Sequence, residues 1–560
     1  MGYEFDLGAY SRSINADNRD AQHWFDRGLL WLYGFNREEA VSCFRKAQHA
    51  DPNAAMPHWG EAYAAGPFIN LPWQWQSEAE RRTALTTCFA ATEAALARRE
   101  GASLVERALV EALPARYQRS AAASADQLSA WDDAFAAAMR DVHRRFPADP
   151  DVAALFAEAL ITRTPWQLWD LDTGKPADGA DTLEAKAVLE AGMRQLRDRG
   201  HPPHPGMLHM VIHVMEMSQT PEHALAEADQ LRRLCPDNGH LDHMPTHIYF
   251  QCGRYAEALE ASRTAVAADE KYARRAGAFN FYTTARCHHL HAMMNAAMLL
   301  GDHGGAEEAA QGITRTVTPE LLRQDRPTLV QSLDYFRSGT IHVPVRFGRW
   351  REIVDAPIPP HPELYVTTTL MVHYAKGVAH AALGNFDAAD RERSRFDAGC
   401  AVLPEDRICA NDTASNVMAV AREMLYGEVA YHQGNHEAGF AHLREAVRLN
   451  DRLRYSEPWP WMHSPRHALG ALLLEQGQLE EAEQVYRADL GLDDTVRRCL
   501  QNRDNVWSLH GHHECLQRMG RDREAAALAP ALAAALARSD VEVASSCHCR
   551  KQPVEGSQPC

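Results

Sequence analysis

Long apolar segments are missing from this chain of 560 residues. No run of the ~18 apolar residues that a spanning helix requires appears, so we expect no membrane partner. The start, MGYEFDLGAYSRS, carries acidic residues and lacks the apolar stretch of a secretory signal. Asp6 stands where a myristoylation signal has Ser or Thr. These absences predict a cytoplasmic protein.

Positive charge is also scarce in this sequence. The 58 lysines and arginines are outnumbered by 75 acidic residues, which gives a net charge of −17. No stripe of Lys and Arg offsets that charge, and the phosphate groups of a nucleic acid repel an acidic surface. We therefore expect no nucleic-acid partner.

Cysteine shows no disulfide framework. The 12 cysteines are scattered along the chain, which favours a reduced, intracellular setting with most thiols in the core. The exception is the tail segment Cys547-His548-Cys549. Two interpretations of this tail remain open, an arm of thiolate ligands or an unstructured end.

Common catalytic signatures are absent too. The chain contains no Walker loop, no G-x-S-x-G elbow and no dinucleotide fingerprint between a strand and a helix. Almost no segment alternates apolar and polar residues with a period of two, so no sheet is expected. Catalytic residues are therefore not predicted, and the sequence does not decide whether the protein is an enzyme.

A helical repeat is present. Residues of alternating small and large size recur with the spacing of a 34-residue tetratricopeptide repeat, namely Trp24, Gly28, Trp31, Ala40, Phe44, Ala47 and Pro52. Small residues let two antiparallel helices approach, large residues fill the gap between pairs, and Pro52 ends the second helix. The first repeat thus predicts a helix pair.

Turn signals extend this pattern along the chain. A glycine followed by a polar and then a large residue recurs at Gly253, Gly348, Gly384, Gly434 and Gly477, and less regularly at Gly301 and Gly520. We predict an all-α fold, a right-handed tetratricopeptide-repeat α-solenoid of antiparallel helix pairs. Its predicted parts are N-terminal helix pairs (1–160), a Trp-bearing loop and connecting helix (161–203), a central and C-terminal superhelix (204–535) and a tail (536–560).

Two irregular segments interrupt the repeats. Residues 162–182 are rich in Pro, Gly and Asp and carry Trp166 and Trp169, and residues 66–75 carry Trp73 and Trp75. The simpler interpretation is that these tryptophans pack on the solenoid. The alternative is that the two loops form a lid over a binding groove.

Histidine is the compositional outlier, with 29 residues, and it favours the helices expected on the concave face. His209 and His213 lie four residues apart on one helical face, and Glu216 extends that face. Imidazoles at this spacing can chelate one ion. With His243, His247 and His291 they form our predicted metal ligands, for zinc or copper by ligand type.

Other inner-face side chains complete the predicted groove. We assign groove or binding roles to Glu216, His288, His373, His467, His510 and His513. Each single histidine also has a plainer interpretation as a hydrogen-bonded residue of the groove.

Several segments outside the generic repeat pattern carry a resemblance. The segments WFDRGLLWLYGFNREEAVSCF, TPWQLWDLDTGKPADGADTLEA, HPGMLHMVIHVMEMS, GHLDHMPTHIYF and SSCHCR resemble a family of bacterial and fungal tetratricopeptide-repeat proteins of largely unassigned function. A more distant likeness is to the tetratricopeptide repeat protein 38 family. The resemblance implies a superhelix with a groove around His209, His213, His243, His247 and His291. His289 stands where the family pattern has Asn, so the local site is left open.

Three functions remain at this point. The first is a binding protein or scaffold that holds a small-molecule or protein ligand in a histidine-lined concave groove. The second is a metal-dependent hydrolase or oxidoreductase acting on a small molecule there. The third is metal storage or sensing. Substrate and oligomeric state are not indicated.

Overall fold

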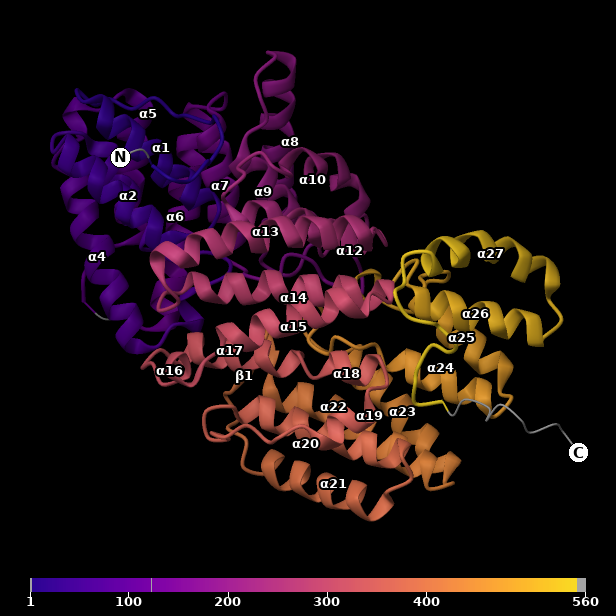
Figure 1. Cartoon of the computed structure of the whole chain (residues 1–560). Helices are drawn as coiled ribbons and strands as arrows, with labels where there is room; N and C mark the ends of the chain where they lie inside the picture. The colour runs from indigo at the N-terminus through magenta and orange to yellow at the C-terminus, as the bar shows by residue number, and fades with distance from the viewer. Residues whose placement is uncertain (1–2, 122, 551–560) are drawn as a thin grey trace, which may run out of the picture. The chain divides into compact units, whose positions relative to one another are not determined.

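The computed structural model describes residues 3–121 and 123–550, and almost all of its regular structure is helical (Figure 1). Its contacts group the chain into two compact units. The first unit comprises residues up to 248 together with 260–289 and 326–328. The second comprises residues 249–259, 290–325 and the chain from 329 onward.

The helices of the first unit follow one another with short connections. They are α1 (Arg19–Tyr33), α2 (Arg37–Ala50), α3 (Ala55–Ala64), α4 (Glu78–Leu96), α5 (Leu104–Arg116), α6 (Ala125–Arg145), α7 (Pro150–Thr162), α8 (Thr182–Asp198), α9 (Pro205–Met215), α10 (Leu225–Leu231) and α11 (Gly239–His243). Short 3-10 turns are η1 (Trp73–Trp75), η2 (Arg99–Gly101) and η3 (Pro221–Ala224). Four helices contribute residues to both units, namely α12 (Pro245–Gln251), α13 (Tyr255–Ala276), α14 (Tyr282–Leu300) and α17 (Pro327–Gly339).

The second unit continues with helices and one small hairpin. Its helices are α15 (His303–Thr316), α16 (Pro319–Leu322), α18 (His342–Arg346), α19 (Trp350–Asp355), α20 (Val366–Ala382), α21 (Phe386–Cys400), α22 (Ala414–His432), α23 (His436–Asn450), α24 (Pro465–Glu475), α25 (Leu479–Asp489), η4 (Arg498–Leu500), α26 (Val506–Arg518) and α27 (Asp522–Leu536). Strands β1 (Ile408–Cys409) and β2 (Asp412–Thr413) pair antiparallel. The sequence did not predict this hairpin because two residues per strand are too few for an alternating pattern.

Consecutive helices pack as pairs. Helices α1 and α2 form one pair, and α20 to α27 form four more in chain order, as Figure 1 shows for the orange and yellow part of the chain. The seven predicted turn glycines have φ between 63° and 88°. Only glycine adopts that left-handed conformation without cost, so each ends one helix where the next turns back. The predicted all-α fold of tetratricopeptide-type helix pairs is confirmed.

The first pair shows why small and large residues alternate. A Cβ on Gly28 would lie 2.7 Å from the Phe44 ring, and one on Gly60 would lie 2.5 Å from it. These glycines therefore let α1 and α3 close around Phe44, as the spacing predicted for Gly28. Trp24 differs from the prediction: it is only half-buried, and Arg27 and Lys46 lie over its ring.

The cysteines and the tail behave as two groups. Cys43, Cys88, Cys235, Cys287, Cys409 and Cys515 are buried free thiols. Cys547 and Cys549 are joined by a disulfide. The tail segment packs on the second unit, where Arg550 bonds Glu514. Both interpretations of Cys547-His548-Cys549 are therefore wrong, because its cysteines are buried and form a disulfide instead of free thiolates or an unstructured end. Residues 551–560 lie outside the described residues.

No helix among the described residues is long and apolar enough to cross a bilayer.

Candidate metal centre

Helix α9 presents two histidines one turn apart. His204 caps its start by accepting the Met207 backbone N–H at 3.1 Å, and Pro205 occupies the first turn, where its missing N–H costs nothing. All of α9 is buried. The i, i+4 spacing brings the Nε2 atoms of His209 and His213 within 3.0 Å of each other, as the sequence predicted for one helical face.

The opposite ring nitrogens fix which atoms carry protons. His209 Nδ1 lies 2.6 Å from the Tyr33 carbonyl oxygen, which can only accept, so Nδ1 is the donor. His213 Nδ1 lies 2.9 Å from Glu216 Oε1 and donates to the ionised carboxylate. In the neutral rings both Nε2 atoms therefore carry lone pairs, and these lone pairs face each other. A proton or a metal ion between them stabilises that arrangement.

A relay from Asp269 adds a third imidazole. His289 Nδ1 donates to Asp269 Oδ2 at 2.6 Å, and His289 Nε2 lies 3.3 Å from His240 Nδ1. The carboxylate orients His289, which orients His240 so that its Nε2 carries a lone pair. That Nε2 is buried without a hydrogen-bond partner. His209, His213 and His240 each offer one nitrogen within 4.8 Å of the others, and we call them set one.

A second group of three imidazoles comes from α11, α12 and α14. His243 Nε2 lies 2.9 Å from His247 Nε2 and 2.9 Å from His288 Nε2. Each of these residues also offers one nitrogen within 4.8 Å of the others, and we call them set two. The pattern repeats α9, because His243 and His247 are again four residues apart.

Glu216 connects the two sets. One carboxylate oxygen accepts from His213 Nδ1 of set one, and the other accepts from His247 Nδ1 of set two. Glu216 is fully buried, and both of its carboxylate oxygens accept from these imidazoles. Carboxylates that orient metal-bound histidines in this way are usual behind metal sites.

Burial favours the neutral form of three of these imidazoles, those of His209, His240 and His243. Five of the six ligands are buried and His288 is half-buried. Burial first, and then the neighbouring imidazole of His213, lowers the pKa of His209 well below its usual range. Burial and neighbouring histidines likewise lower the pKa of His240 and His243. The neutral form favoured at these three rings is the form that binds a metal.

The spacing suits coordination. Two nitrogens about 2.1 Å from a tetrahedral zinc ion lie about 3.4 Å apart, so binding would move the rings apart slightly from the 2.9–3.0 Å separations found here. A set of imidazoles without a first-sphere carboxylate suits zinc or copper and is a poor match for magnesium or calcium. Three protein ligands also leave coordination positions open.

Aromatic side chains enclose set one. The Phe35 ring lies 4.4 Å from that of His209 and stacks on that of His240 at 5.3 Å. From the loop 162–182, the Trp166 ring lies 5.7 Å from that of His213, and Trp169 Nε1 donates to the Val214 carbonyl at 2.6 Å. This loop therefore both packs on α9 and covers part of the cluster.

A buried carboxylate, that of Asp151, positions Tyr33, whose carbonyl oxygen bonds His209. Asp151 accepts hydrogen bonds from the hydroxyls of Tyr10 and Tyr33, from Arg12 and from His204 Nε2. Opposing its burial, the Arg12 guanidinium and these donors hold the pKa of Asp151 well below its usual range. Asp151 thereby fixes both the N-cap of α9 and the residue whose carbonyl orients His209.

The structure places the predicted ligands in different ways. It brings His209 and His213 into set one and His243, His247 and the predicted groove residue His288 into set two. His291 belongs to the second unit, where its ring lies 5.4 Å from those of Tyr335 and Phe336. Burial and His342 lower the pKa of His291 to about 3. The two sets are also buried, rather than spread along an open groove.

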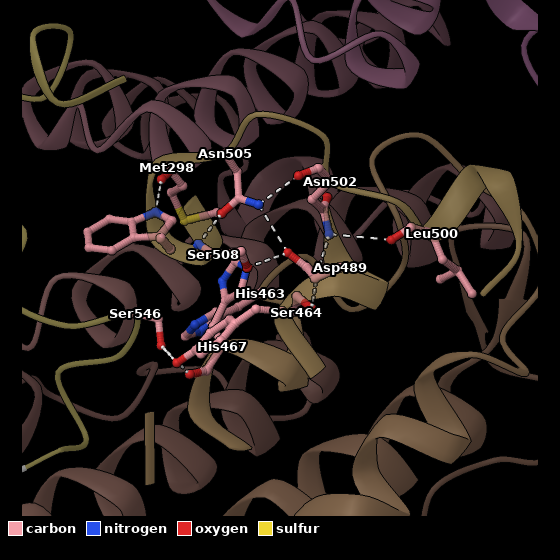
Figure 2. Close-up of polar contacts among 12 residues, drawn as sticks. Met298, His463, Ser464, His467, Asp489, Leu500, Asn502, Asn505, Ser508 and Ser546 are labelled. Atoms are coloured by element: carbon pink, nitrogen blue, oxygen red, sulfur yellow. Dashed lines mark hydrogen bonds and ion pairs between the residues drawn. The ribbon is translucent and has the colours of Figure 1, made fainter. Parts of the chain in front are cut away.

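The remaining predicted groove residues lie in the second unit. His373 bonds Glu392 at 2.6 Å. His467 bonds Asp489 at 3.0 Å, in the network that Figure 2 shows together with Ser464, Asn502, Asn505 and Ser508. His510 and His513 are half-buried on α26.

Sequence reasoning missed His240 as a candidate ligand and His289 and Asp269 as the residues that orient it. One signal was available, because His240 precedes His243 by three residues and so shares its helical face. Asp269 lies on α13, and no spacing in the sequence connects it to His289.

No family model and no curated protein matches this chain. Among solved structures, a human IFIT1 dimer with m7Gppp-AAAA is similar at 11% identity and a TM-score of 0.31, over 93% of this chain and 91% of that one. The APC/C hetero-tetramer Cut9-Hcn1 is similar at 14% identity and a TM-score of 0.28, over 77% of this chain and 74% of that one. Such low scores carry no argument about this chain, so the fold assignment rests on the helix pairs and turn glycines described above.

Proposed function

We propose that this tetratricopeptide-type protein binds transition-metal ions, zinc or copper, at set one and set two, and holds a small-molecule ligand at their open coordination positions. One observation carries the proposal. The Nδ1 atoms of His209 and His213 are committed to Tyr33 and Glu216, which leaves two Nε2 lone pairs facing each other at 3.0 Å. Neutral imidazoles hold that geometry when a cation lies between them.

Elemental analysis tests the proposal. Protein purified without a His-tag should contain close to two equivalents of zinc or copper per chain, or take them up on titration after chelation. The double variants His209→Ala/His213→Ala and His243→Ala/His247→Ala should each lose one equivalent. His432→Ala/His436→Ala is the control, because it removes two histidines four residues apart in the sequence but on different helices, α22 and α23, and outside both sets. Metal-free protein that binds neither ion on titration contradicts the proposal.

A metal-dependent enzyme is the second candidate, and access to the metal favours it. His288 is the one half-buried ligand, so set two has an edge through which a small molecule can approach. With three ligands, zinc keeps a position for water and activates it, while copper permits oxidation. Metal-loaded protein screened against ester, amide and phenol substrates distinguishes the two. Turnover that disappears in His243→Ala/His247→Ala supports the enzyme, and ligand binding without turnover supports the binding protein.

A further inference from the structure

The second unit contains a separate, partly open cavity of about 60 Å³. Gln251 at the end of α12 and Tyr255 at the start of α13 form one side of its wall. Asn450, the last residue of α23, also lines it, together with residues 456–459, Trp461, Met462 and Ser464. These residues all belong to the second unit, and none takes part in set one or set two.

Three oxygens of this wall are buried without hydrogen-bond partners. They are Gln251 Oε1, Tyr255 Oη and Asn450 Oδ1. The exposed fractions of the three residues are 7%, 2% and 3%. A buried polar atom without a partner costs free energy, and native structures rarely leave several around one space. The cavity therefore requires a guest that forms hydrogen bonds.

The charge of the wall specifies the guest. Glu457 contributes a carboxylate, and the described lining residues include no lysine, arginine or histidine. Trp459 and Trp461 add aromatic surface. Acceptor oxygens, one negative charge and aromatic rings together favour a positively charged group with several N–H donors, as in an ammonium ion.

One hydrogen-bond donor of the wall also lacks an acceptor. Trp461 lines the cavity, and its Nε1 is buried without a partner. An indole nitrogen only donates, so the guest should also carry an oxygen with a lone pair. Since one water needs about 10–15 Å³, the cavity has room for about four to six non-hydrogen atoms.

We propose that this cavity binds a small amino alcohol, a primary ammonium group and a hydroxyl joined by a short carbon chain. The ammonium donates to Gln251 Oε1 and Asn450 Oδ1, with Tyr255 Oη as a further acceptor. The hydroxyl oxygen accepts from Trp461 Nε1. The proposal does not rest on the proposed metal centre.

Calorimetric titration of the full chain with ethanolamine tests the site. We expect one saturable site with a dissociation constant between about 0.04 mM and about 1 mM, since the four non-hydrogen atoms of ethanolamine gain at most about 1.5 kcal/mol each. Ethylene glycol has the same size and two hydroxyls but no charge, and it should bind about tenfold more weakly. Equal binding of the two overturns the ammonium assignment. Binding of neither shows that the cavity holds only water and overturns the proposal.

Variants locate the binding. Tyr255→Phe and Asn450→Leu each remove one unpartnered oxygen and should weaken ethanolamine binding about tenfold. Tyr426→Phe is the control, because its hydroxyl bonds Asp397 outside the cavity. The thermal midpoint of each variant without ligand shows whether it has folded. Folded Tyr255→Phe and Asn450→Leu that bind ethanolamine like the unaltered chain contradict the proposed location.

Discussion

The two units contain the same histidine spacing in different electrostatic surroundings. In the first unit, His209 and His213 face each other through Nε2. In the second, His463 and His467 have the same i, i+4 spacing, but Arg346 donates to His463 Nε2 at 2.8 Å and to His467 Nδ1 at 3.0 Å. The chain itself supplies a cation to the second pair. Sequence spacing alone therefore does not distinguish a metal site from an arginine site.

Asp489 completes the arginine site. It accepts His467 Nε2–H and further hydrogen bonds from Ser464, Asn502, Asn505 and Ser508 (Figure 2). Opposing the burial of the carboxylate, His467 and these donors hold the pKa of Asp489 well below its usual range. Arginine and carboxylate thus fix the protonation of this pair without an added ion.

The largest expected effect is on metal content, when each of the two histidine pairs is replaced by alanine in turn. His209→Ala/His213→Ala should abolish metal binding at set one, because two of its three ligands are lost. His463→Ala/His467→Ala should leave the metal content unchanged. Elemental analysis of both variants from the same medium is the measurement. Equal loss of metal in both would show that the two pairs do not differ as described.

The next effect concerns the internal cation. Arg346 is buried, and its burial lowers its pKa to about 9. Arg346→Met removes the donor to both imidazoles and should destabilise the protein by about 3 kcal/mol, the cost of breaking a buried charged network. Urea unfolding at pH 7 measures it. Arg349→Met, on an exposed arginine side chain of the same region, should change stability by less than about 0.5 kcal/mol.

Glu216→Gln should weaken metal binding at both sets by about 10- to 100-fold. A glutamine amide can accept from one Nδ1–H, but its NH₂ group must donate to the other ring. That ring then carries its proton on Nε2, where the lone pair for the metal should be. Competition titration with a chromophoric chelator measures the affinity. The exposed Glu93→Gln is the control, and unchanged affinity in Glu216→Gln would contradict its orienting role.

The smallest effect is a pH dependence of the second unit. Burial lowers the pKa of His342 to about 3. As pH falls below about 6.5, the unfolded chain takes up a proton that folded His342 refuses, so stability falls with pH, by about 1.4 kcal/mol at pH 5.5. His342→Leu should reduce this slope in urea unfolding between pH 7 and 5.5. His23→Gln, at an exposed position, should not.

The fold was predictable because its signals are local. A glycine that must adopt positive φ, followed by a large residue, marks a turn wherever it occurs, as at Gly384 and Gly477. Close approach around Phe44 likewise follows from spacing within one repeat. The partial exposure of Trp24 does not follow from this spacing, because it depends on what lies beyond α1 and α2.

The site was predictable only in part. Helical periodicity predicts that His209 and His213 lie on one face of a helix. It does not predict that α11 and α14 pack close to this pair. His288 and His291 lie on one helix three residues apart, and nothing local indicates that only His288 joins a set. The burial of all this polar surface was also unexpected, because it depends on Glu216, Asp269 and Asp151 satisfying the imidazoles from the side.

Because the Glu216 carboxylate contacts both sets, an ion bound at one set should lower the metal affinity of the other. When an ion occupies set one, His213 becomes a stronger donor to Glu216 and draws electron density from it, so His247 of set two becomes a weaker base. Linkage requires the reverse effect to be of the same size. Ions should therefore enter in two resolved steps, with the second weaker than the first.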